Sequence, residues 1–495
     1  MDEQLQRDAG SAMMWKSVQM VGTKLIFFVR LFILARLLSP ADFGLMAVAM
    51  VAIDVLISVT NFGMVPALVQ QKEAQTSHYH AAWSVGLLRA MAISLVVFFG
   101  APVIAVIVGE PEVVDLVRVL AFLPTIDALA SIGLVELMRT LAFRQLAIVD
   151  LAKTLLSTVI AIALAPSWGV WALVAGSLAG SLTYTIFSYV LAPYRPRLTL
   201  NWGKMRPLMH YGRWIFITSL VAVAGSAALR VVVSRQLGAV ELGLYFLAAR
   251  LAFLPTEVAS DVMGAVTFPL YARLQNETEQ VAQLFRANLL TLSALLVPIF
   301  TLIAVLAPAM VTHVLGERWE GTEQIIQLLA IIGILGLVTD IAVPAFKGLG
   351  FPSYVTWIEG AQSLSLVLFV FWFTRRFGLL GAPLAWFPAI FGSLVLAVIF
   401  LRGLLPRPFA GLAGPLLAIG GVALLGGLVA TAVYHFSPTF FGFILAGLSG
   451  AALIFGLTWL LDWRFKLGIG QSLATLFPQI ALLVQGRGRL KAGTR

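Results

Sequence analysis

Polar and charged side chains recur at helical spacing inside long apolar segments of this 495-residue sequence. Two such stripes comprise Lys16, Gln19, Thr23 and Arg30, and Ser219, Ser226 and Arg230. Intervals of three, four and seven residues return to nearly the same face of a helix. An ionisable group at bilayer depth costs about 2.5–3.5 kcal/mol, so it normally faces a cavity or a partner. The two stripes therefore predict polar helix faces that meet either a cavity or a partner within the protein.

A second pair of stripes carries acidic groups, and it comprises Arg250, Glu257 and Asp261, and Asp54, Ser58 and Asn61. Two more carboxylates lie near prolines, since Asp127 follows Pro124 and Asp340 precedes Pro344, and we expect both helices to be interrupted there. Burial favours the protonated form of a carboxylate, which suits a proton carrier. The candidates for coupling to H+ or Na+ are therefore Asp54, Asp127, Glu257, Asp261 and Asp340. The alternative is that these acids neutralise buried cations, as Glu257 would by pairing with Arg250.

The composition places these stripes in a membrane. The chain is 60% hydrophobic and only 11% charged, with a mean hydropathy of +0.96, whereas soluble domains carry about 25% charged residues. Breaks at prolines, glycines and charge clusters give about fourteen spans between residues 15 and 461, including 113–138 and 212–236. We therefore expect an all-α polytopic membrane protein, and no soluble stretch is long enough for a catalytic domain.

Residue usage excludes several chemistries. The chain has no cysteine, which excludes disulfides, thiolate nucleophiles and cysteine-ligated metals. It has no Gly-x-x-x-x-Gly-Lys-Ser/Thr motif, so we expect no Walker-type ATPase site. His78 and His80 have no third ligand nearby, and we expect a surface loop there. The sequence thus predicts no catalytic residue, no metal site and no cofactor other than a coupling ion.

The distribution of basic residues indicates the orientation. If the N-terminus is cytoplasmic, 21 of the 33 lysines and arginines fall on that side and 5 on the other. Such an excess marks the cytoplasmic side, so both termini are predicted to be cytoplasmic. The tail over 462–495 combines an amphipathic segment with a basic run, and we expect it to bind the anionic cytoplasmic leaflet; a partner-binding tail is the alternative. The N-terminus lacks the basic region of a signal peptide.

An internal repeat divides the chain. Ala35-Arg36-Leu37-Leu38 and Asp42-Phe43-Gly44-Leu45 correspond, 199 residues later, to Ser234-Arg235-Gln236-Leu237 and Glu241-Leu242-Gly243-Leu244. Farther along, Gly109 matches Gly316 and Gly169 matches Gly378. The predicted parts are an N-lobe of six spans (1–192), a basic linker (193–213), a C-lobe of six spans (214–402), two extra spans (412–461) and the tail. Parallel repeats of this kind occur in transporters whose two bundles share a central cavity.

The segment Leu38-Ser39-Pro40-Ala41-Asp42-Phe43-Gly44, with Asn61-Phe62-Gly63 after the second span, resembles the polysaccharide-transport branch of the MOP superfamily. The resemblance covers residues 10–405. It implies two pseudo-symmetric six-helix lobes in a V shape, with extra C-terminal helices in some members. The implied substrate is a polyprenyl-pyrophosphate-linked oligosaccharide, moved by alternating access from the cytoplasmic to the periplasmic leaflet of a bacterial inner membrane. Polysaccharide polymerase machinery is a further candidate partner, and nucleic acid is not expected.

The resemblance also gives the polar stripes a role, because the first, second, seventh and eighth helices line the gap between the lobes in this family. The implied substrate-binding residues are Arg30, Arg230, Lys24, Arg250, Gln19, Thr23, Ser226 and Asn61. Arg30 and Arg230 would bind the pyrophosphate through bidentate hydrogen bonds, and Lys24 would act as a point charge. The alternative for the charged members is pairing within the protein.

Three other functions remain open at this point. An ion-coupled multidrug or small-molecule antiporter of the same superfamily would favour acidic cavity faces, whereas the first and seventh spans are basic. A membrane-embedded polysaccharide polymerase or ligase would need a larger extramembrane domain than connections of about 20 residues provide. A lipid scramblase or scaffold is the third alternative. The sequence favours the flippase.

Overall fold

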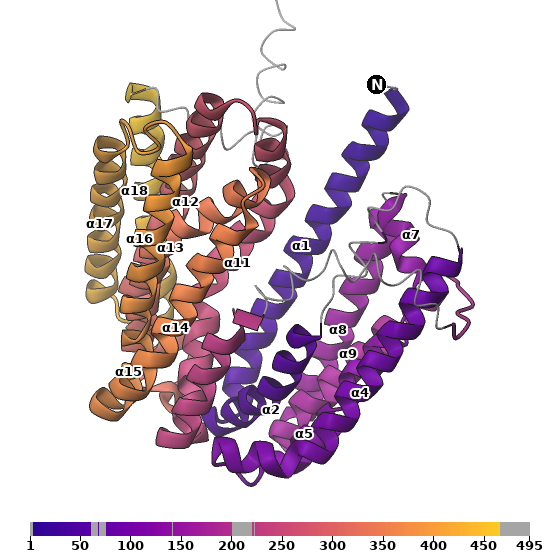
Figure 1. The fold of residues 1–495 in the computed structure, drawn as a ribbon. Coiled ribbons are helices and arrows are strands. Elements are labelled where there is room, and N and C mark those ends of the chain that lie inside the picture. Colours follow the sequence, from indigo (N-terminus) through magenta and orange to yellow (C-terminus); the bar gives the residue numbers. More distant parts are fainter. Residues whose placement is uncertain are drawn as a thin grey trace, which may run out of the picture. The chain divides into compact units, whose positions relative to one another are not determined.

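The computed structural model describes residues 3–60, 68, 76–140, 142–199, 220–221 and 223–465. All regular secondary structure within these residues is helical (Figure 1). Twelve of the described helical segments are long and apolar enough to cross a membrane, which confirms the all-α polytopic fold class. The chain divides into two compact units, unit 1 (Met1–Leu244) and unit 2 (Tyr245–Arg495). The predicted lobe, linker and tail boundaries stay predictions.

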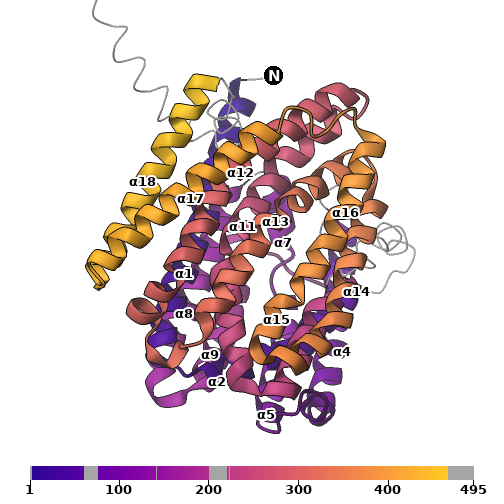
Figure 2. The same cartoon turned by 90° about the vertical axis from the view of Figure 1, so that its left-hand side faces the viewer.

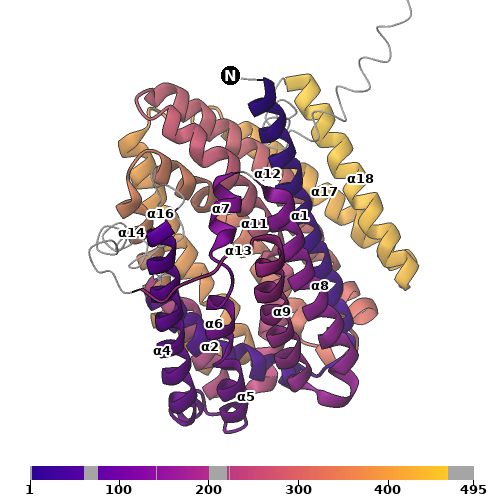
Figure 3. The ribbon, with the colours of Figure 1, turned by 90° about the vertical axis from the view of Figure 1, so that its right-hand side faces the viewer.

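Unit 1 is built around two groups of packed helices. Its elements are α1 (Glu3–Leu37), α2 (Pro40–Val59), α4 (Thr76–Val108), α5 (Val113–Leu120), α6 (Leu123–Ala128), α7 (Gly133–Arg139), α8 (Phe143–Trp168), α9 (Val170–Leu191), a helix that includes 223–237, and the start of α11 (Ala239–Arg273). Helix α8 packs between α1 and α9, and α4 packs on α5 and α6 (Figure 3). Gly176 and Gly180 allow α9 to approach the backbone of α8 near Ser157, as a Gly-x-x-x-Gly pattern permits.

Unit 2 continues α11 and adds α12 (Thr278–Met310), α13 (Thr322–Gly348), α14 (Pro352–Phe377), α15 (Gly381–Leu384), α16 (Trp386–Leu404), α17 (Ala413–Phe436) and α18 (Phe440–Phe465). A short π-helix (Val311–Leu315) and two 3-10 turns (Glu317–Trp319 and Gly378–Leu380) complete it. Helices α17 and α18 lie side by side and pack on α12 (Figure 2). The core is aromatic as well as aliphatic, since Phe285, Phe300 and Phe346 are fully buried.

Two of the fourteen expected spans are not among the twelve. The span expected over 113–138 is wrong, because this segment forms the three short helices α5, α6 and α7. Pro124 lies in the first turn of α6, and it cannot donate the backbone hydrogen bond that a continuous helix needs. The span expected over 212–236 lies partly outside the described residues, and only its 220–221 and 223–236 portions are seen as helix.

The two predicted interruptions beside an acid have different outcomes. The chain is broken near Asp127, since α6 ends at Ala128. The interruption expected near Asp340 is wrong, because α13 runs without a break from Thr322 to Gly348. Pro344 removes one hydrogen bond to the carbonyl of Asp340, but the remaining bonds and the packing of α13 on its neighbours preserve the helix.

Glycines matched by the internal repeat have matching backbone conformations. Gly109 and Gly316 end their helical segments with φ of 83° and 99°. Gly169 has φ 53° and ψ −130°, and Gly378 has φ 59° and ψ −138°. Residues with a Cβ rarely adopt these conformations, so the repeat preserves the residue type that each helix ending requires.

Candidate functional site

The Ser-Pro-x-Asp motif sets the start of α2. Ser39 is the N-cap, and its side-chain oxygen accepts a hydrogen bond from the Asp42 backbone N–H at 3.3 Å. The Asp42 carboxylate accepts one from the Ser39 backbone N–H at 2.8 Å, which completes a capping box. Pro40 is the first helical residue, where a missing N–H is tolerated. This local chemistry determines where α2 begins and hence which way its polar face points.

Two repeat-related glycines let the starts of α2 and α11 approach closely within unit 1. A Cβ at Gly44 would fall well inside contact distance of the carbonyl oxygen of Ala239, and a Cβ at Gly243 would do the same to that of Pro40. The contacts are reciprocal, because Gly243 and Ala239 lie 199 residues after Gly44 and Pro40. We call this contact the glycine crossing. It places backbone directly against backbone.

Arg230 and Asp54 form an ion pair in unit 1. The helix over 223–237 provides Arg230 and α2 provides Asp54, and a guanidinium nitrogen lies 2.9 Å from a carboxylate oxygen. The two side chains are 22% and 37% exposed, so the pair is shielded but reachable. The structure thus joins a predicted substrate-binding cation to a predicted ion-coupling acid. Neither sequence stripe indicated the pairing.

The polar stripe on α1 contacts α8. Arg30 donates a 2.8 Å hydrogen bond to the Ser157 hydroxyl, and Gln19 hydrogen-bonds to the Asp150 carboxylate. Thr23 bonds back to the carbonyl of Gln19 on its own helix. The α1 stripe is therefore satisfied, at least in part, by polar groups within unit 1.

Lys153 is a further cation of unit 1, and it contacts both an acid and an aromatic ring. Lys153 on α8 lies 3.6 Å from an Asp127 carboxylate oxygen and 4.8 Å from the centre of the Tyr184 ring. Sequence reasoning assigned no role to Asp150, Lys153 or Ser157. Their spacing of three and four residues along α8 is the signal that would have identified a polar face there.

In unit 2, Arg250 pairs with Glu257 on the same helix. Their closest charged atoms are 3.4 Å apart, and the Arg250 guanidinium also lies 5.2 Å from the centre of the Phe246 ring. The side chains of Arg250 and Glu257 are 43% and 39% exposed, so the pair remains open. Asp261, one turn farther along α11, is exposed. The alternative of pairing within the protein is therefore realised for Arg250.

The remaining predicted residues show no common cluster. Ser226 bonds to the Val223 carbonyl on its own helix, and Lys24 is half-buried on α1. Asp340 is half-buried on α13 in unit 2. Asn61 and Ser219 lie outside the described residues.

The surface loop expected around His78 and His80 is wrong, because both residues lie in the first turns of α4. His80 accepts a hydrogen bond at Nδ1 from the Arg197 backbone N–H at 3.0 Å, and the Tyr194 hydroxyl lies 3.2 Å from the same nitrogen. Burial raises the pKa of Tyr194. No group of three His, Asp or Glu side chains suited to a metal is found among the described residues. His80 therefore holds the segment after α9 against α4.

Comparison of the sequence with known proteins gives one family. Residues 33–324 match the family described as "Polysaccharide biosynthesis protein". The succinoglycan biosynthesis transport protein ExoT of Rhizobium meliloti strain 1021 is 29% identical over 391 residues, which cover 78% of this chain and 76% of that protein. The lipopolysaccharide biosynthesis protein WzxC of Escherichia coli strain K12 is 23% identical over 324 residues, which cover 65% of this chain and 66% of that protein.

Comparison with solved structures gives the fold. The lipid II flippase MurJ in an inward closed conformation has a TM-score of 0.72 at 15% identity, covering 92% of this chain and 100% of that one. An inward-facing multidrug resistance MATE transporter of the MOP superfamily has a TM-score of 0.60 at 16% identity, covering 79% and 97%. These likenesses show that the chain shares the fold of both transporters. Because the family match spans more than half of the sequence, this chain belongs to the polysaccharide biosynthesis protein family.

Proposed function

We propose that this protein is a flippase for lipid-linked oligosaccharide repeat units, working by alternating access in surface or exopolysaccharide synthesis. The family and the named transport relative support a transporter rather than an enzyme. The observation that carries the proposal is the Arg230–Asp54 pair, a shielded but reachable cation whose counterion can be displaced. The Asp54 carboxylate makes one contact with the Arg230 guanidinium, at 2.9 Å. A phosphate could accept two parallel hydrogen bonds from the same guanidinium.

The proposed cycle exchanges partners on Arg230. The polyprenyl-linked pyrophosphate binds the guanidinium and displaces Asp54. After the site opens to the periplasm, an incoming H+ or Na+ binds the Asp54 carboxylate as the substrate leaves Arg230. When the site faces the cytoplasm again, Asp54 releases the ion there and pairs with Arg230, so that neither group stays buried without a partner. Arg30, which needs only to exchange the Ser157 hydroxyl for phosphate, is the second proposed contact.

We further propose that the protein lies in a bacterial inner membrane with both termini in the cytoplasm, and that substrate moves toward the periplasm. Unit 2 supports this orientation. One end of its helices carries Arg273, Arg286, Lys347, Arg402 and Arg407, against the acids Glu277, Glu279 and Asp462. The opposite end carries Arg318, Arg375 and Arg376, against Glu317, Glu320 and Glu323. The cationic excess at the first end is the pattern of a cytoplasmic face.

A multidrug antiporter is the second candidate, because a MATE transporter shares the fold. Cationic drugs would need acidic side chains that are not engaged with arginine. Asp54 and Glu257 both pair with arginines, and α1 has basic but no acidic residues from Lys16 onward. These charges favour an anionic substrate.

Deletion of the gene in its native host tests the proposal. We expect loss of surface polysaccharide and accumulation of single lipid-linked repeat units on the cytoplasmic leaflet. Complementation should succeed with wild type, fail with Arg230→Ala and recover partly with Arg230→Lys, since lysine returns the charge without the fork geometry. Arg375→Ala is the matched control, an exposed arginine far along the chain from the polar stripes. Normal polysaccharide with Arg230→Ala at wild-type protein levels would refute the assignment.

A further inference from the structure

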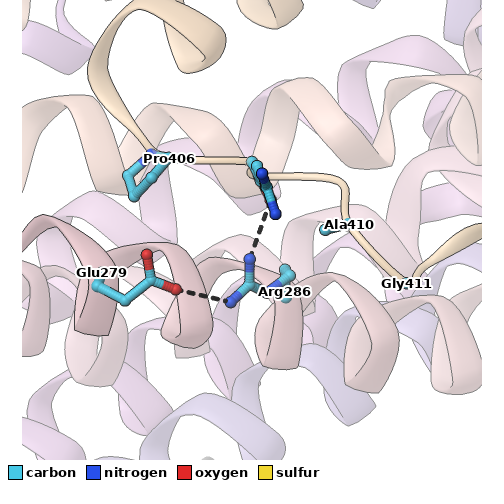
Figure 4. Close-up of a pocket in the computed structure, with 6 residues that line it drawn as sticks. Glu279, Arg286, Pro406, Ala410 and Gly411 are labelled. Atoms are coloured by element: carbon cyan, nitrogen blue, oxygen red, sulfur yellow. Dashed lines mark hydrogen bonds and ion pairs between the residues drawn. The ribbon is translucent and has the colours of Figure 1, made fainter.

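A pocket lies in unit 2 where the connection between α16 and α17 crosses the first turns of α12 (Figure 4). Its volume is about 570 Å³, and it is lined by Glu279, Arg286, Pro406, Arg407, Ala410 and Gly411. None of these residues belongs to the polar stripes or to the ion pairs described above. The pocket therefore needs an explanation of its own.

Arg286 organises the pocket from α12. One guanidinium nitrogen donates a 2.9 Å hydrogen bond to the backbone carbonyl of Arg407, and the other lies 3.4 Å from the Glu279 carboxylate (Figure 4). The Arg286 side chain is only 20% exposed, so its position is well defined by packing. Next to Arg286, the ring of Phe409 packs edge-on against the ring of the fully buried Phe285, with 5.9 Å between the ring centres. The connection is thus anchored at two neighbouring points.

Arg407 is held in an unusual conformation. Its φ is +45°, the one positive φ at a non-glycine residue in the described chain. A long side chain is disfavoured in this region, and such conformations persist where the surroundings impose them, often at ligand-binding positions. Among the described residues, the Arg407 guanidinium has neither a hydrogen bond nor an ion pair, although its carbonyl is bonded by Arg286. The backbone is strained and the cation it carries is available.

The charge of the pocket selects an anion. The lining contains two arginines and a single carboxylate, that of Glu279. The Glu279 side chain is 62% exposed and is already paired with Arg286. The pocket also lies at the end of unit 2 with the cationic excess, close in sequence to Arg402. Basic pockets between helices at a membrane surface suit the phosphate groups of anionic lipids.

We propose that this pocket binds the phosphate group of an anionic membrane lipid, with Arg407 as the direct contact. Arg286 is a positioning residue, because its hydrogen bond to the Arg407 carbonyl orients the strained turn. The non-polar side chains of Pro406 and Ala410 provide a wall for the glycerol or isoprenyl carbons next to the phosphate. The site is separate from the proposed Arg230 contact, so its test does not depend on transport.

The decisive variant is Arg407→Gly. It removes the guanidinium and also relieves the positive φ, so the turn should fold at least as well as in wild type. Arg402→Gln is the matched control, because it removes a charge of the same sign from the same end without lining the pocket. The full-length protein in phosphatidylcholine nanodiscs, with and without phosphatidylglycerol, is assayed by native mass spectrometry for retained lipid and by thermal unfolding. We expect Arg407→Gly to bind phosphatidylglycerol about fivefold more weakly, and Arg402→Gln to bind like wild type.

The source of the phosphate is distinguished by competition. Farnesyl pyrophosphate that displaces phosphatidylglycerol from wild type, and binds Arg407→Gly more weakly, would identify the lipid-linked substrate as an occupant. Retention of phosphatidylglycerol in the presence of farnesyl pyrophosphate would identify a structural phospholipid. Equal binding by wild type and Arg407→Gly, or an equal loss in Arg402→Gln, would overturn the proposal, because either result means that the surface attracts anionic lipid without this pocket.

Discussion

The glycine crossing gives the sharpest stability prediction. In Gly44→Ala, the new methyl group meets the backbone carbonyl of Ala239, and in Gly243→Ala it meets that of Pro40. Backbone atoms cannot rotate away as a side chain would. Real Cβ atoms essentially never lie within 3.0 Å of a non-bonded heavy atom from another part of the chain, and both added methyl groups would be well inside that limit. The starts of α2 and α11 would therefore have to separate by roughly 1 Å, an overpacking that costs about 1–3 kcal/mol.

Thermal unfolding of the purified protein in detergent measures this cost. We expect Gly44→Ala and Gly243→Ala each to lower the Tm by several degrees. The double variant should lose less than the sum of the two, because one alanine already opens the crossing that the other obstructs. The matched control is Gly100→Ala in α4, where an added methyl group meets nothing within 4 Å and improves helix propensity. If the two crossing variants unfold at the same temperature as Gly100→Ala, the close approach of the two helices is wrong.

Three other predictions follow from single contacts. Arg230→Gln should lower the Tm, because it leaves Asp54 unpaired. Adding Asp54→Asn should restore the Tm but not complementation. Transport by the double variant would limit Arg230 to a structural role. Ser157→Ala removes the acceptor for Arg30 and should destabilise by about 1.5–3 kcal/mol, whereas Ser157→Thr should unfold closer to wild type; equal Tm values for the two variants would contradict this. Gly378→Ala places a side chain at φ 59° and ψ −138° and should cost about 1–3 kcal/mol in thermal unfolding; a wild-type Tm would contradict the conformation.

The fold was largely predictable because lipid imposes simple rules on sequence. Apolar length predicted most spans. The repeat matched Gly169 with Gly378, and the structure gives both residues a positive φ at a helix ending. A single span over 113–138 was wrongly predicted because hydropathy measures only apolar content. Whether the helix continues there depends on its backbone hydrogen bonds, which Pro124 interrupts. A single proline does not always decide this, since α13 continues through Pro344.

The site was only partly predictable. Helical spacing grouped polar positions such as Arg30, Asp54 and Arg230 into stripes, but spacing within one helix does not specify the partner on another. The pairing of Arg230 with Asp54 depends on how α2 packs, which involves residues 176 positions apart. Arg250 and Glu257 were predictable as a pair because they lie on the same helix, two turns apart.

The long sequence separation of these polar contacts has a consequence for synthesis. The hydroxyl partner of Arg30 is translated 127 residues later, and the carboxylate partner of Gln19 131 residues later. At about 5–20 residues per second, the ribosome needs roughly 6–25 s to reach them. During that interval α1 must remain at the membrane with its polar stripe unsatisfied by α8. The nascent first helix is therefore a natural client for the insertion machinery, which would have to shelter it until α8 emerges.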